Sequence, residues 1–195
     1  MTDHAELNTR LLRRSAVTAA GAAVVSAGVA VLLFPYVSGE AYAWALTVCL
    51  TVAASAVAVV DVRTHTLPNR YVSAVAAAGL VQAAVVSTAA HDGTRLLESL
   101  IAAVAVFAVY VLLGLVGWFG FGDAKFAGAL AVTVAIYAGF AAMYLVPLAI
   151  VFAAAGMLFG RAAGRVSHAR AHGPAIGLAA VCIMTTAVLG LFAAP

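Results

Sequence analysis

Long apolar runs, almost free of charge, limit what this chain can fold into more than any other feature of its sequence. A membrane-spanning helix needs roughly 20 apolar residues, whereas a membrane strand needs only about 9–11 and alternates in hydrophobicity. Only 9% of the 195 residues are charged, against about a quarter in soluble domains. The apolar runs are of helical length and lie at about 15–36, 41–60, 71–90, 96–118, 126–160 and 174–193. The sequence therefore predicts an all-α integral membrane protein.

The run at 126–160 decides the number of spans. As one helix it would be about 52 Å long, well over the roughly 30 Å of bilayer hydrocarbon, so we predict two short spans joined by a tight turn near Tyr137 to Met143. Cytoplasmic loops collect Lys and Arg, and this division puts nine of the ten basic residues, all but Arg95, on the side of the N-terminus. An undivided run would move the basic cluster at 161–170 to the outside, which leaves six basic residues on the side of the N-terminus and four on the other side. We therefore predict a bundle of about seven helices, with six or eight as alternatives, a cytoplasmic N-terminus and a single membrane domain over residues 1–195.

The composition excludes several function classes. A water-soluble enzyme, a nucleic-acid binder and a secreted disulfide scaffold need a soluble domain, for which the spans leave no room. Cys49 and Cys182 stand alone in apolar runs and are interpreted as small buried hydrophobic residues, so no metal site and no cofactor are predicted. Arg13 and Arg14 precede the first run as in a secretory signal, but that run exceeds the about 7–15 apolar residues of such signals. An uncleaved first span is the better interpretation.

Two aspartates occupy unusual places. Asp61 and Asp123 each closely follow an apolar helix at a predicted cytoplasmic end, where an ionisable residue is costly and suggests function. The hairpin of spans between them returns the chain to the same membrane face, so the two carboxylates can meet. Two close carboxylates share a proton, as in an aspartic peptidase. Glu98, about one turn into the fourth span, is a minor candidate that we interpret as reaching back to the interface near Arg95.

The local sequences around the two aspartates strengthen this hypothesis. Pro68 ends the helix that carries Asp61 about one turn beyond that residue, which holds the carboxylate on a rigid end. Gly120 and Gly122 precede Asp123, and the absence of their side chains leaves space for another peptide segment, such as a substrate, to approach.

These two segments resemble the motifs of the type IV prepilin peptidases, a family of membrane aspartic endopeptidases. Residues 61–69 match D-x-[RK]-x-x-x-[IL]-P-[ND], residues 120–125 match G-x-G-D-x-K, and the resemblance extends from about residue 40 to the end of the chain. It implies that Asp61 and Asp123 are the catalytic pair. It also implies that the remaining motif residues shape the site or contact substrate or lipid headgroups, namely Arg63, Pro68, Asn69, Gly120, Gly122 and Lys125.

The resemblance implies cleavage of the leader peptide of prepilins or pilin-like precursors at the cytoplasmic face of the inner membrane. Longer members of the family carry a cysteine-rich insertion and methylate the new N-terminus, but this chain has no such insertion. It is similar to the short members, which favours Flp-type precursors as substrates; the oligomeric state stays open. The alternatives are proton- or ion-coupled transport, a presenilin-like intramembrane protease and a non-catalytic pilus assembly factor.

The histidines are interpreted without a catalytic role. His65 follows Asp61 by four residues, but the intervening chain approaches a proline break, so we expect a solvated loop residue. His168 and His172 stand near Arg165 and Arg170 and are interpreted as part of a basic cytoplasmic loop that attracts anionic lipid.

Overall fold

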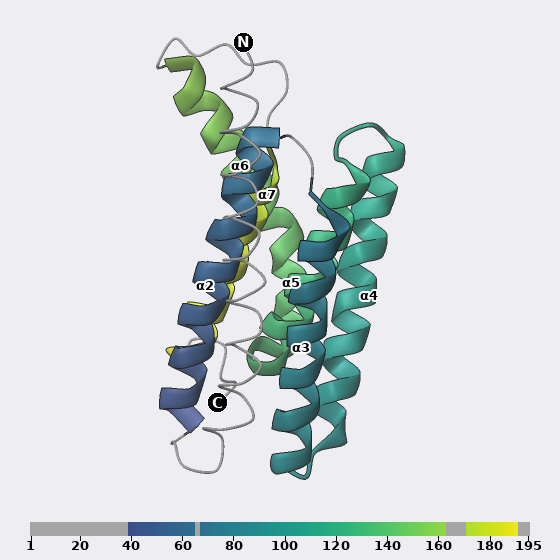
Figure 1. Cartoon of the computed structure of the whole chain (residues 1–195), viewed down its shortest axis with the longest axis vertical. Coiled ribbons are helices and arrows are strands. Elements are labelled where there is room, and N and C mark those ends of the chain that lie inside the picture. Colours follow the sequence, from purple (N-terminus) through teal and green to yellow (C-terminus); the bar gives the residue numbers. More distant parts are fainter. Residues whose placement is uncertain (1–38, 65–66, 163–170, 191–195) are drawn as a thin grey trace, which may run out of the picture.

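The computed structural model describes residues 39–64, 67–162 and 171–190, and these ranges contain helices and no strands (Figure 1). The elements are α2 (Gly39–Thr64), α3 (Asn69–Ala89), α4 (Gly93–Leu115), α5 (Phe121–Ala138), the 3₁₀ helix η1 (Gly139–Tyr144), α6 (Leu145–Ala162) and α7 (Gly173–Val188). The span expected at 15–36 lies outside the described residues.

Four apolar stretches of these described ranges are long enough to cross a membrane. They are Ala41–Arg63, Asn69–Ala89, Gly93–Leu115 and Phe121–Gly160, and the apolar helix Gly173–Val188 is shorter. The protein is therefore a multi-pass membrane protein, and its described part is all-helical. The count of seven spans and the cytoplasmic N-terminus stay predictions.

The long apolar run is broken where the sequence predicts a turn. Between α5 and α6 the backbone tightens into η1, which begins at Gly139 with a φ of +53°, a conformation that other residues rarely adopt. Gly139 lies beside the Glu98 carboxylate near the start of α4. The turn is therefore at the end of the bundle opposite the α4–α5 loop, and α6 runs back from it (Figure 1).

The central helix is α5, which is buried without a break from Phe126 to Ile136 and contacts α3, α4 and α7. Small residues permit this close packing. A Cβ atom added at Gly128 would lie 3.1 Å from the Phe107 Cβ on α4, and one added at Gly177 on α7 would lie 3.1 Å from the Ala54 Cβ on α2. The core lies along these interfaces.

The order of the helices in space differs from their order in the chain. The main neighbour of α2 is α7, not α3, which follows it directly. The C-terminal end of α2, the α4–α5 loop and the N-terminal end of α7 therefore gather at one end of the bundle (Figure 1). We call it the aspartate end, because both Asp61 and Asp123 lie there, and we call the opposite end, with the α3–α4 connection and η1, the turn end.

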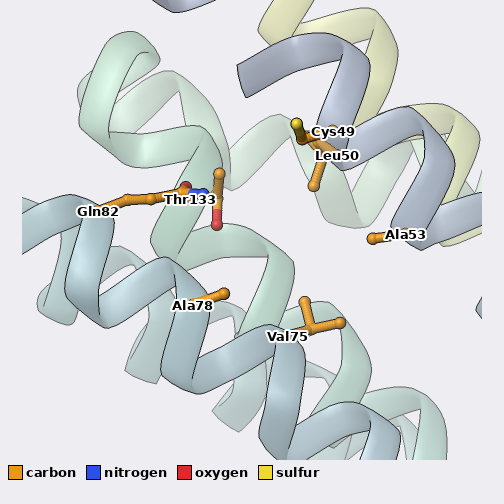
Figure 2. A pocket seen from close by; sticks show the side chains of 7 residues that line it. All are labelled: Cys49, Leu50, Ala53, Val75, Ala78, Gln82 and Thr133. Atoms are coloured by element: carbon orange, nitrogen blue, oxygen red, sulfur yellow. The ribbon is translucent and has the colours of Figure 1, made fainter. Parts of the chain in front are cut away.

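A small cavity of about 20 Å³, enough for a water molecule, lies between α2, α3 and α5 (Figure 2). Its lining consists of Cys49, Leu50, Ala53, Val75, Ala78, Gln82 and Thr133. Cys49 precedes Asp61 by twelve residues on α2, or about 18 Å along the axis, so the cavity is separate from the aspartate end. Cys49 and Cys182, which the sequence predicts to be small buried hydrophobic residues, are each partly buried.

Candidate active site

Asp61 lies in the last turn of α2 and is almost completely buried, with 4% of its surface exposed. Its Oδ2 accepts a hydrogen bond of 2.7 Å from the backbone amide of Gly173, the first residue of α7. The first amides of a helix have no partner within the helix and are favourable sites for a carboxylate. The contact joins residues 112 positions apart, so α7 provides the partner that the burial of Asp61 requires.

Glycine is needed at position 173 because the carboxylate is so close. A Cβ atom added there would lie 2.7 Å from Oδ2 of Asp61 and 3.2 Å from its Cβ. Any other residue would force Asp61 or the start of α7 to move.

Asp123 is held at the N-terminal end of α5, where it is the third residue. Its Oδ2 accepts a 3.0 Å hydrogen bond from the Gly120 amide, while its own amide donates to the Gly120 carbonyl at 3.1 Å. This reciprocal pattern fixes the first turn of a helix. Asp123 is half-buried and lies close enough to Asp61 for their charges to interact. The structure thus brings together the two carboxylates that the sequence singles out.

The two motif segments also contact each other directly. A Cβ atom added at Gly122 would lie 3.2 Å from the Leu67 Cβ and 3.8 Å from the Leu67 backbone nitrogen. The segment that approaches Gly122 is therefore the chain's own Leu67, where the sequence suggested room for a substrate. Pro68 is the N-cap residue directly before α3, and its carbonyl accepts a 3.0 Å hydrogen bond from the Tyr71 amide.

Lys125 links the same two motifs from the surface. Its Nζ donates a 3.0 Å hydrogen bond to Oδ1 of Asn69 and lies 5.2 Å from the centre of the Phe121 ring. Arg63 is exposed at the end of α2. Contact of either cation with substrate or lipid stays a prediction.

His172 corrects the sequence-based interpretation most clearly. The sequence predicts it to lie in a basic cytoplasmic loop, but only 8% of its surface is exposed. Its ring stacks on Phe119 with centroids 4.2 Å apart, and its Nε2 lies 3.2 Å from the Tyr110 hydroxyl on α4. Burial lowers the pKa of His172 to about 4, so the imidazole is neutral at neutral pH.

Sequence reasoning missed Tyr110 and Phe119 altogether. The available signals were a tyrosine inside an otherwise apolar span and an aromatic residue directly before Gly120. Neither signal points to His172, 62 and 53 positions further along the chain.

The other candidates lie elsewhere. Glu98 is beside Gly139 at the turn end, and Arg95 pairs with Asp92, with 3.4 Å between Nε and Oδ2. His65 and His168 lie outside the described residues. In the described part of the chain, no three His, Cys, Asp or Glu side chains gather in a group that could hold a metal ion.

Comparison with known proteins identifies a family. A sequence model described as the type IV leader peptidase family matches residues 44–193, which is more than half of the chain and includes both aspartates. No curated protein and no solved structure gives a significant match.

Proposed function

Because the chain belongs to the type IV leader peptidase family, and is therefore a membrane protease of the leader peptidase type, we propose that it cleaves prepilin leaders with Asp61 and Asp123 as its catalytic pair. The observation that carries the proposal is the convergence of these two carboxylates. They come from helices far apart in the sequence, each accepts a hydrogen bond from a backbone amide, and their charges interact.

The proposed reaction uses one water molecule. One carboxylate takes a proton from the water as its oxygen attacks the scissile carbonyl, and the other, protonated, donates its hydrogen bond to the carbonyl oxygen. The tetrahedral intermediate then collapses, and the first carboxyl returns its proton to the leaving amine. Because the pair must hold one proton, the rate should depend on pH in a bell shape that reports the pair and not either residue alone.

The proposed substrates are prepilins or pilin-like precursors, with Flp-type precursors favoured. The precursor would lay its apolar helix against the bundle, with its leader in the cytoplasm and the scissile bond at the inner-membrane surface. Support comes from the position of both aspartates at helix ends, in the last turn of α2 and the first turn of α5. An ion pathway would instead favour a carboxylate near the bilayer midplane, and Val60 stands where presenilin-like proteases have a tyrosine.

The test is cleavage of a precursor in detergent, followed by mass spectrometry of the product. We expect the intact protein to remove the leader, and Asp61→Asn and Asp123→Asn each to reduce the rate at least about 100-fold. Asp92→Asn is the matched control, because it changes an exposed aspartate at the turn end and leaves a residue that also caps helices. Cleavage that survives both substitutions, or none by the intact protein on Flp-type, type IV and archaeal-type precursors, would refute the proposal.

A further inference from the structure

We propose that the stacked rings of Phe119 and His172, fixed by Tyr110, position the two backbone amides that hold Asp61 and Asp123. The inference rests on the proposed function of the same site. It assigns positioning roles to three residues outside the two aspartate motifs.

The first step is a symmetry in the site. The amide that binds Asp123 belongs to Gly120, directly after Phe119, and the amide that binds Asp61 belongs to Gly173, directly after His172. Each carboxylate is thus held by the residue that follows an aromatic ring. Those two rings stack on each other, 4.2 Å apart and inclined by 25°. The stack therefore ties one amide donor to the other.

The second step is the anchor beneath the stack. Tyr110 is completely buried on α4, its ring lies 5.4 Å from that of Phe119, and its hydroxyl is 3.2 Å from Nε2 of His172. Buried polar groups need a partner, and here the hydroxyl and the imidazole nitrogen satisfy each other. This contact fixes the rotation of the His172 ring and, with it, the start of α7.

The third step is the route by which His172 acts on the site. Its ring contacts Tyr110 and Phe119, and the amide of the next residue, Gly173, binds Asp61. It is therefore a positioning residue. A displacement of about 1 Å at a catalytic group can cost about 100-fold in rate, so loosening the stack should be costly without any loss of a reacting group.

The experiment compares ring removal with ring replacement. His172→Ala and Phe119→Ala should each lower kcat between about 10- and 100-fold with little change in KM. The double variant Tyr110→Phe/His172→Phe keeps a stack and leaves no polar group unpaired, so its rate should lie within about threefold of the intact protein.

The control is Phe140→Ala, which removes an exposed ring in η1 at the turn end and should not change kcat.

A second readout does not need cleavage. Hydrogen exchange followed by mass spectrometry reports the protection of peptides that contain Gly120 and Gly173. His172→Ala should deprotect both peptides together, and so should Phe119→Ala, which also gives the answer if the histidine variant does not fold. Deprotection limited to the substituted segment overturns the inference. So does a Tyr110→Phe/His172→Phe variant as inactive as His172→Ala, because it would show that the Tyr110 hydroxyl or the His172 imidazole itself takes part in the chemistry.

The two failures can be told apart. If the intact protein cleaves no precursor, the proposed function fails, while joint deprotection of the two peptides still supports the positioning role. If the intact protein cleaves and His172→Ala cleaves equally well, the positioning role fails and the proposed function stands.

Discussion

The aspartate end and the turn end of the bundle use polar residues in different ways. At the aspartate end, hydrogen bonds join residues 56, 62 and 112 positions apart. At the turn end, Asp92 accepts from the Thr94 amide, Arg95 pairs with Asp92, and Ser99 donates to the Arg95 carbonyl. All of these partners are within four positions in the chain.

The short-range contacts of the turn end stabilise the end of one helix, whereas the long-range contacts of the aspartate end hold different helices together. Contacts within a turn need only local structure, because the partners are already close. Long-range polar contacts near the membrane must recover the cost of desolvating both partners and ordering distant segments. Where such contacts gather around two carboxylates, they indicate a site, whereas the turn-end contacts cap and support the start of α4.

The largest expected effect comes from Gly173→Ala. The added methyl group would lie 2.7 Å from the Asp61 carboxylate, so we expect cleavage to fall about 100-fold, although alanine is the better helix former. Gly93→Ala, at the first position of α4, is the matched control and should cleave normally, because no atom beyond its own helix and chain neighbours lies within 4 Å of the added Cβ. Equal rates for the two variants would mean that the long-range contact has no bearing on activity.

An intermediate effect is expected for Lys125→Met. The substitution removes the bond to Asn69 but keeps the side-chain length, and because the contact is exposed we expect only about a threefold loss of kcat. Asn69→Asp converts the same contact into an ion pair and should retain activity. A rise in KM for Lys125→Met with kcat unchanged would instead indicate contact with the substrate.

The pH dependence of stability should report the protonation of His172. Its pKa is lowered to about 4 in the folded state by burial, whereas an unfolded histidine titrates near its ordinary value of about 6.5. As the pH falls, the imidazole therefore takes up its proton in the unfolded chain before it does so in the folded protein. The neutral, buried His172 contributes fully to the free energy of unfolding above about pH 6.5, and this contribution is lost as the pH falls toward 4. The apparent Tm of Tyr110→Phe/His172→Phe should fall less steeply over this range. Parallel curves for the two proteins would show that His172 is not the buried titrating group.

The smallest effect on activity is expected for Asp92→Ala at the turn end. It removes the cap of α4 and should lower the apparent Tm by at most a few degrees. Asp92→Asn, which can still accept from the Thr94 amide, should keep most of that stability. Cleavage should be unchanged in both variants, and a loss of rate would connect the two ends of the bundle.

The sequence indicates much of this fold because membrane spans leave strong signals. Apolar length and Pro68 mark the described helices, and excess length at 126–160 predicts the break that the structure places at η1. Asp61 and Asp123 are found for the same reason, since a carboxylate beside an apolar helix stands out.

The supporting residues leave no such signal. The prediction for His172 is wrong because Arg165 and Arg170 nearby suggest a basic loop at the membrane surface, whereas α7 packs on α2 and the imidazole lies against Phe119. A ring stack between residues 53 positions apart depends on which helices become neighbours, and the sequence does not specify the pairing of α2 with α7. The single-domain assignment and the full number of spans stay predictions.

The pairing of α2 with α7 also sets the order in which the site is made during synthesis. Asp61 emerges from the ribosome 112 residues before Gly173, whose amide donates a hydrogen bond to it in the folded protein. At about 5–20 residues per second, this interval is roughly 6–22 s. Throughout it the proposed dyad lacks one of its two anchors, so a nascent chain has an incomplete site until the start of α7 has been synthesised and docked.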